Sequence, residues 1–130
     1  MPNMDKVVLD ASALIALLKN EAGAEKVKPH LPNSLLSTVN LYEVITVLAR
    51  YGYDASEARN DIGNLVGAII PYSDSHACAA ATIHQQTRQQ GLSLGDCACL
   101  AVAQLEQVVA LTADTVWQNV NVDVVIQTIR

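Results

Sequence analysis

Short apolar runs alternate with segments of helical periodicity along this chain, and that alternation constrains its fold more than any other feature. Residues 6–9 and 34–37 each form an apolar run that leads directly into a helix-like segment. In the second segment the apolar side chains share one face: Leu41, Val44, Ile45 and Leu48. Parallel strands need crossover connections, which are usually helices. The pattern therefore predicts an α/β fold, a three-layer α/β/α sandwich with a central parallel sheet.

The rest of the sequence continues this alternation. We expect further helices over residues 56–65, 73–88 and 93–106, and further strands over residues 68–71, 108–112 and 122–126. Thr38 and Ser93 are the expected N-caps of their helices, and a short helical turn ends near Trp117. No repeat, linker or low-complexity segment divides the sequence, so residues 1–130 are expected to form one domain.

Composition indicates a reduced, cytoplasmic protein. The chain is 51% hydrophobic and 16% charged, which allows a core without disulfide or metal cross-links. Three cysteines cannot all pair with one another, and Cys97-Ala98-Cys99 lacks the spacing of zinc or thioredoxin motifs. All apolar runs are far shorter than the roughly 20 residues of a membrane-spanning helix. Asp5 and Asp10 interrupt the pattern of a signal peptide, so neither export nor a membrane location is expected.

Four acidic residues fall where an open parallel sheet gathers functional groups, outside the carboxyl ends of its strands. Asp10 follows the first strand, Glu43 lies early in the helix after the second, Asp96 begins a later helix, and Asp114 lies two residues past the fourth strand. Clustered carboxylates repel one another and raise each other's pKa, so they require a compensating cation. Mg²⁺ or Mn²⁺ suits such oxygen ligands and, with bound water, suits phosphodiester hydrolysis. A net charge of −5 disfavours the alternative of a broad basic surface for nucleic acid.

Each acid taken alone is better explained by a structural role. Asp10 and Asp114 could cap the helical segments that follow them, and the helix dipole favours Asp96 in a first turn. Glu43 could be a solvated helix residue. Only the shared position of the four acids at strand ends favours a joint function.

Four segments of the sequence resemble the PIN domain family, and in particular PIN domains of the VapC toxin type. They are VVLDASAL, STVNLYEV, LSLGDCACLA and LTADTVW, at residues 7–14, 37–44, 92–101 and 111–117. The resemblance implies a PIN-like α/β/α fold and an Mg²⁺- or Mn²⁺-dependent endoribonuclease that leaves 5′-phosphate and 3′-hydroxyl ends. It also implies a toxin that a VapB-like antitoxin neutralises.

The resemblance assigns the catalytic positions to four acids: Asp10, Glu43, Asp96 and Asp114. Asp10, Asp96 and Asp114 are the expected metal ligands. Ser12 and Thr112 are the expected hydroxyl groups that orient a carboxylate or metal-bound water. The sequence departs from the family at Cys97, where many relatives have arginine after the third acid. It also carries Thr115-Val116 where some relatives have a further acid, which argues against a second metal ion.

RNA, an antitoxin and a second copy of the chain are the expected partners. Residues 38–50 and 56–65 carry more apolar side chains than one buried stripe requires, which indicates a surface for a protein partner. The alternative function is a catalytically silent PIN-like module that binds RNA or protein, although 4% aromatic residues provide few stacking platforms. Phosphoryl transfer through an aspartyl intermediate is disfavoured, because Ser12 stands where haloacid-dehalogenase-like enzymes need a second acid.

Overall fold

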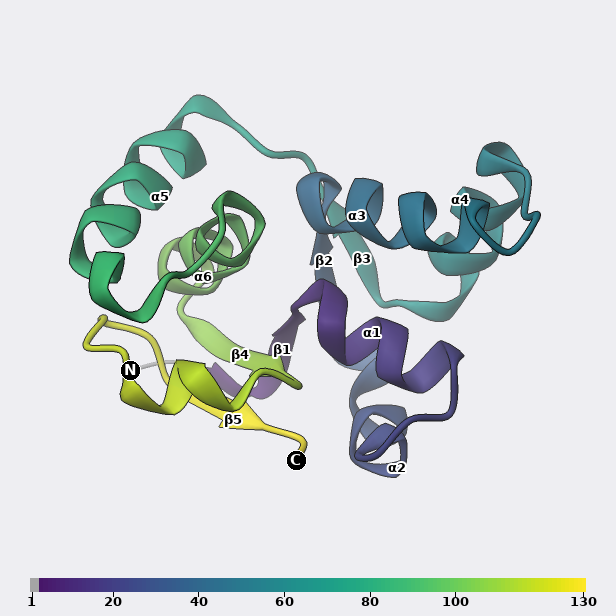
Figure 1. Ribbon diagram of the computed structural model, residues 1–130, viewed down its shortest axis with the longest axis horizontal. Helices are drawn as coiled ribbons and strands as arrows, with labels where there is room; N and C mark the ends of the chain where they lie inside the picture. Colours follow the sequence, from purple (N-terminus) through teal and green to yellow (C-terminus); the bar gives the residue numbers. More distant parts are fainter. Residues whose placement is uncertain (1–2) are drawn as a thin grey trace.

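A five-stranded parallel sheet forms the centre of the molecule, in the order β3-β2-β1-β4-β5 (Figure 1). The computed structural model describes residues 3–130. Its strands are β1 (Asn3–Leu9), β2 (Ser34–Ser37), β3 (Ala68–Ile70), β4 (Val108–Thr112) and β5 (Ile126–Thr128). Val8 of β1 is aligned with Leu35 of β2 on one side and with Ala110 of β4 on the other.

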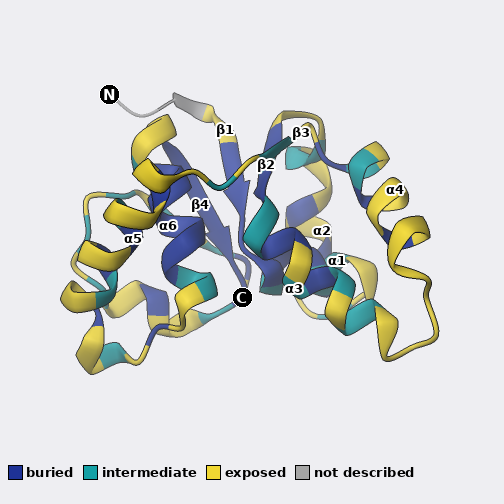
Figure 2. Ribbon diagram, turned by 90° about the horizontal axis from the view of Figure 1, so that it is seen from above, coloured by how far each residue is buried: buried dark blue, intermediate teal, exposed yellow. Residues whose placement is uncertain are grey.

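Helices cover both faces of this sheet (Figure 1). One face carries α1 (Ala11–Leu18), α2 (Ala24–Val27), η1 (Lys28–Asn33), α3 (Thr38–Ala49) and α4 (Ala55–Leu65). The other carries α5 (Asp74–Gln86), η2 (Arg88–Gln90), α6 (Leu94–Glu106) and η3 (Thr115–Asn119), where η denotes a short 3₁₀ helix. α6 lies against the sheet and α5 packs outside it, which leaves α5 largely exposed (Figure 2). The predicted α/β/α sandwich with a parallel sheet is confirmed.

The adjacent strands β1 and β4 contribute side chains to two apolar cores, one on each face of the sheet. Val7 and Leu9 of β1 contribute to the core beneath α1 and α3, whereas Val8, which lies between them, contributes to the core beneath α6. The same alternation in β4 places Leu111 in the first core and Ala110 in the second. This division follows from the opposite directions of successive side chains in a strand. Full burial of each valine or leucine contributes roughly 1.5–3 kcal/mol to folding.

The strand order brings the carboxyl ends of β1 and β4 together. From β1 the chain adds β2 and then β3 on one side, and it later returns to add β4 and β5 on the other. Adjacent strands whose connections leave in opposite directions open a crevice at their carboxyl ends, where ligands bind in open α/β sheets. The residues just after β1 and β4 therefore occupy the place where a site is expected.

Most predicted elements are present, but one cap and one strand were wrong. Ser37, not Thr38, caps α3, since Ser37 Oγ accepts from the Val39 N–H at 3.1 Å. Thr38 is the first helical residue, and its hydroxyl oxygen accepts instead from the Tyr72 N–H at 3.1 Å. The last strand begins at Ile126 rather than at residue 122, because Val122 and Val124 pack against the α6 side without joining the β4 ladder.

The sequence patterns missed α2 and η1, which fill the connection between α1 and β2. These elements contain four and six residues, too few for periodicity to reveal them. Gly23 precedes α2 with a φ of 92°, a left-handed conformation that glycine adopts without penalty. Among residues 3–130, no helix combines the length and the hydrophobicity that a membrane crossing requires.

Candidate active site

Asp10 is a buried carboxylate directly after β1. Its backbone caps α1, but its side chain makes no capping hydrogen bond, and only 2% of the residue is exposed. Instead Oδ2 accepts from the Ser12 hydroxyl at 2.6 Å and from the Thr112 hydroxyl at 2.9 Å. The interpretation of Asp10 as a simple helix cap is therefore wrong for its side chain. This carboxylate belongs to a network that joins the end of β1 to the end of β4.

The two hydroxyl groups in this network are themselves held by the backbone. Ser12 Oγ accepts from the Ala113 N–H at 3.0 Å, and Thr112 Oγ1 accepts from the Asp114 N–H at 3.1 Å. Each hydroxyl has a single hydrogen, and here that hydrogen points to Asp10. Their orientation is therefore fixed by four hydrogen bonds, and both donate to one oxygen of one carboxylate.

Asp114 makes the predicted capping contact, and Asp96 lies in the first turn of α6 as expected, where it also takes part in a cap. Asp96 Oδ2 accepts from the Ser93 N–H at 2.9 Å, while Ser93 Oγ accepts from the Asp96 N–H at 3.1 Å, which forms a capping box at the start of α6. Asp114 Oδ1 accepts from the Val116 N–H at 3.0 Å and caps η3. The structural interpretation of these two acids is confirmed, and it leaves a second oxygen on each.

Glu43 projects from α3 onto the first turn of α6. Asn40, one turn earlier, donates from Nδ2 to Glu43 Oε1 at 2.7 Å and to the Gly95 carbonyl oxygen at 3.1 Å. A Cβ at Gly95 would lie 2.5 Å from both carboxylate oxygens of Glu43, so only glycine leaves room for this side chain. Sequence reasoning missed both Asn40 and Gly95. The three-residue spacing of Asn40 and Glu43 on one helix was the available signal.

The four acids lie within electrostatic reach of one another. The pKa of Asp10 is raised to about 7, chiefly by burial; the charges of Asp96 and Glu43 add to this rise, and the Ser12 and Thr112 hydrogen bonds oppose it. Burial also raises the pKa of Glu43, with Asp96 adding to it, and raises the pKa of Asp96, with Asp114 adding to it. Asp96 therefore interacts with the other three acids. The structure brings all four predicted acids to one edge of the sheet.

Cys99 lies beneath this cluster, inside the second core. Burial raises the pKa of its thiol well above the usual value, and the charges of Asp10, Asp96 and Glu43 add to the shift. A thiol that stays protonated packs as a small apolar side chain. Cys97 is also buried, whereas Cys78 is exposed on the outer helix α5. Trp117 is 1% exposed and belongs to the same core.

Each carboxylate uses one oxygen for the hydrogen bonds described above. These are Oδ2 of Asp10, Oδ2 of Asp96, Oδ1 of Asp114 and Oε1 of Glu43. In the described part of the chain, none of the four is paired with Lys, Arg or His; the ion pairs of Glu21 with Lys19 and Arg130 involve other residues. The second oxygens of the four groups therefore remain available to a ligand of positive charge.

The donor set suits a hard divalent cation, although it does not form a closed cage. Among residues 3–130, no three His, Cys, Asp or Glu side chains stand close enough together to hold a metal ion as they are. Carboxylate oxygens with room for water are what Mg²⁺ and Mn²⁺ prefer, because both ions keep several waters in protein sites. The four unpaired carboxylates, one of them buried, thus fit such an ion by charge and by ligand type.

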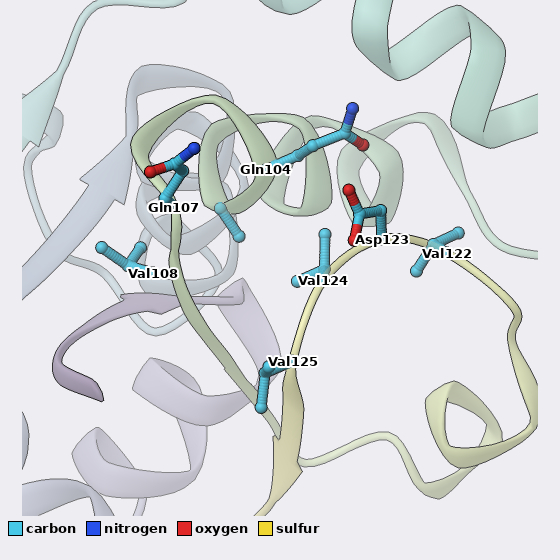
Figure 3. Close-up of a pocket in the computed structure, with 8 residues that line it drawn as sticks. Gln104, Gln107, Val108, Val122, Asp123, Val124 and Val125 are labelled. Carbon is cyan, nitrogen blue, oxygen red and sulfur yellow. The ribbon is translucent and has the colours of Figure 1, made fainter. Parts of the chain in front are cut away.

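A separate hollow of about 310 Å³ lies at the opposite edge of the sheet (Figure 3). Gln104 and Gln107 at the end of α6 line it together with Val108, the first residue of β4, and Asp123 (Figure 3). Thr112, at the other end of β4, marks the edge with the four acids. Asp123 is the single ionisable side chain among the residues that line this hollow. The four acids lie instead at the carboxyl edge of the sheet, which is therefore the candidate site.

The comparison with known families gives a match over most of the chain. The PIN domain model matches residues 7–123, a span that includes all four acids. The chain belongs to the PIN domain family. This membership confirms the resemblance carried by the four sequence segments. No curated protein sequence matches the chain significantly.

Solved structures share the PIN fold at low sequence identity. A toxin–antitoxin complex from Klebsiella pneumoniae is 23% identical, with a TM-score of 0.69 over 85% of this chain and 88% of that one. VapBC-1 from nontypeable Haemophilus influenzae is 20% identical, with a TM-score of 0.69 over 95% and 97%. VapC20 from Mycobacterium tuberculosis, a sarcin-ricin loop cleaving toxin, is 20% identical, with a TM-score of 0.72 over 92% and 98%. At these identities the likeness establishes the fold.

Proposed function

We propose that this PIN domain protein is a metal-dependent endoribonuclease, the toxin of a VapBC-type toxin–antitoxin pair. The observation that carries the proposal is the set of four unpaired carboxylates at the carboxyl edge of the sheet, each with one oxygen hydrogen-bonded and one available. A site of this charge binds a phosphodiester only with a cation between them. The similarity to toxin structures, VapC20 among them, supports RNA as the substrate class.

The residues that would hold the cation are Asp10, Asp96 and Asp114. When bound, Mg²⁺ or Mn²⁺ supplies a Lewis acid for the phosphate oxygen and lowers the pKa of a coordinated water. Ser12 and Thr112 keep the Asp10 carboxylate in one orientation, and their hydrogen bonds favour its ionised form. Glu43 is half-buried beside Asp96, where its available oxygen would accept the proton of the attacking water.

A protein partner fits the opposite side of α3. A groove of about 260 Å³ lies between α1, α3 and α4, and the side chains that line it are mostly apolar: Leu18, Leu48, Tyr53, Ala58, Asp61, Ile62 and Leu65. Tyr42, Tyr51 and Tyr53 are all more than half exposed on the same helix pair and the turn between its members. Exposed aromatic groups beside an apolar groove are typical of protein interfaces. We assign this surface to a VapB-like antitoxin, and we expect the free toxin to be a cytoplasmic homodimer.

The decisive experiment is cleavage of total cellular RNA by purified, antitoxin-free protein. Reactions with Mg²⁺, Mn²⁺ or EDTA are run beside the Asp10→Asn variant, which removes one ligand charge without changing side-chain size. We expect cutting that requires the metal, disappears in the variant and leaves 5′-phosphate and 3′-hydroxyl ends. Binding and protection of RNA by folded protein, with no cutting under any condition, would favour the alternative of a silent PIN-like binding module.

A further inference from the structure

Asn40 is a fully buried asparagine in the first turn of α3, with 0% of the residue exposed. The two N–H groups of its amide reach two different helices: Glu43 Oε1 of α3 at 2.7 Å and the Gly95 carbonyl oxygen of α6 at 3.1 Å. A hydrogen bond to a carboxylate is charge-assisted and is roughly twice as strong as a neutral one. A single side chain therefore joins α3 to the first turn of α6, the turn that carries Asp96.

The other end of this amide has no partner. Asn40 Oδ1 is buried and accepts no hydrogen bond from the described residues. Turning the amide over would place Oδ1 against the Glu43 and Gly95 oxygens, which are also acceptors, so the present orientation is the better one. An unpaired buried acceptor costs about 1–3 kcal/mol. The two hydrogen bonds that the N–H groups donate to Glu43 and Gly95 offset this cost.

Without the Asn40 amide, the Glu43 carboxylate is expected to move away from this position. It lies half-buried against Gly95, where a Cβ would lie 2.5 Å from its oxygens, and it is repelled by Asp96 and Asp10. Like-charge repulsion drives such a side chain toward water when a route to solvent is open. The Asn40 bond is the contact in the described structure that retains this carboxylate.

We infer that Asn40 is a positioning residue: its amide holds the Glu43 carboxylate against the first turn of α6, beside Asp96, and acts on the site through Glu43. The effect on catalysis rests on the proposed nuclease function, whereas the effect on cation binding does not require RNA cleavage. A group that acts only through another has no effect once that other group has been removed. This property separates positioning from a general contribution to the fold.

The test is a double-mutant cycle over wild type, Asn40→Ala, Glu43→Ala and the double variant. Mn²⁺ affinity is measured from the electron paramagnetic resonance signal of free Mn²⁺, and RNA cleavage is measured in the same buffer. The negative charge of Glu43 beside Asp96 adds to the attraction of the site for a cation, so we expect Asn40→Ala alone to weaken Mn²⁺ binding and cleavage by about tenfold or more. In the Glu43→Ala background we expect it to change Mn²⁺ affinity by less than about twofold. Asn60→Ala, an exposed asparagine on α4, is the matched control.

Asn40→Ser provides a second variant, since its short side chain does not reach Glu43, and circular dichroism checks the fold of each protein. Equal losses from Asn40→Ala in both backgrounds would overturn the inference, as would wild-type values for Asn40→Ala or the unfolding of both Asn40 variants. If wild type binds Mn²⁺ but cuts no RNA, the nuclease proposal fails while the Mn²⁺ cycle still decides the role of Asn40. If wild type binds no Mn²⁺, both fail.

Discussion

The hydroxyl group of Thr112 donates a 2.9 Å hydrogen bond to the Asp10 carboxylate, and so connects residues that are 102 positions apart in the sequence. Both residues are buried. The same hydroxyl accepts from the Asp114 N–H at 3.1 Å, which ties a second acidic residue to the pair. One threonine thus fixes the relation between the acids that follow β1 and β4.

Thr112→Val removes this donor while keeping side-chain shape. We expect the pKa of Asp10 to rise further above about 7, since one of two opposing hydrogen bonds is lost. A hydrogen bond to a charged group contributes about 1.5–3 kcal/mol, equivalent to one or two pKa units. The pH profile of RNA cleavage should therefore move upward by about that amount. Thr112→Ser should restore the profile, and Thr46→Val, at an exposed hydroxyl on α3, should leave it unchanged.

Asp10 should make the metal-free protein less stable as the pH rises. Its pKa is about 7 in the folded state against 3.8 in the reference state, so the folded state holds the proton more tightly. The stabilisation is complete below pH 4 and is lost as the pH approaches 7, on the order of 4 kcal/mol in all. Urea unfolding in EDTA between pH 5.5 and 8 should detect about half of this loss. Asp10→Asn should remove the part of this pH dependence that Asp10 contributes and leave the parts that Glu43 and Asp96 contribute. An unchanged slope in that variant would contradict the assignment to Asp10.

Asp96→Asn should abolish cleavage and preserve the fold. An asparagine oxygen can still accept the Ser93 N–H bond that closes the capping box, but the ligand charge is gone. We expect at least a hundredfold loss of rate with a melting temperature within a few degrees of wild type. Asp54→Asn is the matched control, because Asp54 also caps a helix and lies outside the cluster. Cleavage at the wild-type rate in Asp96→Asn would exclude Asp96 from the site.

Gly95→Ala should reduce activity although alanine favours helices. The substitution gains up to about 1 kcal/mol of helix propensity, but the new Cβ would stand 2.5 Å from the Glu43 carboxylate oxygens and displace them. We expect lower cleavage at nearly unchanged stability. In Gly63→Ala the new Cβ would lie 3.0 Å from the flexible end of Arg59 and in ordinary contact with Ile69 Cδ1 at 3.8 Å, so that variant should stay active. Similar activity in both variants would contradict the close fit at Gly95.

Sequence periodicity revealed most of the fold because the strands alternate between two cores. Val7 and Val8 are apolar because they face the two opposite cores, which makes residues 7–9 of β1 a continuous apolar run. Four-residue α2 has no such pattern. Val122 and Val124 resemble a strand in the sequence because both side chains are partly buried against the core, although their segment is irregular. Where apolar side chains pack against the core but their backbone does not pair with a neighbouring strand, the sequence predicts a longer strand than the structure contains.

The acids were predictable because their positions follow the strand ends, whereas the groups that hold them were not. Asn40 contacts Glu43 from the preceding turn of the same helix, and Gly95, which contacts it from another helix, is 52 positions away in the sequence. No local sequence pattern indicates that a glycine provides space for a carboxylate so far along the chain. Ser12 and Thr112 came from the family resemblance, and the structure adds that both donate to one oxygen.

The strand order also determines at what stage of synthesis the site of the proposed nuclease is completed. Asp10 stands near the start of the chain, while its partner Thr112 lies on β4, the strand that pairs with β1 only after more than 100 residues have been made. A growing or prematurely terminated chain that ends before β4 would carry Asp10, Glu43 and Asp96 without the strand that completes their arrangement. For a ribonuclease, this topology would keep unfinished polypeptides harmless to the RNA of the ribosome that makes them.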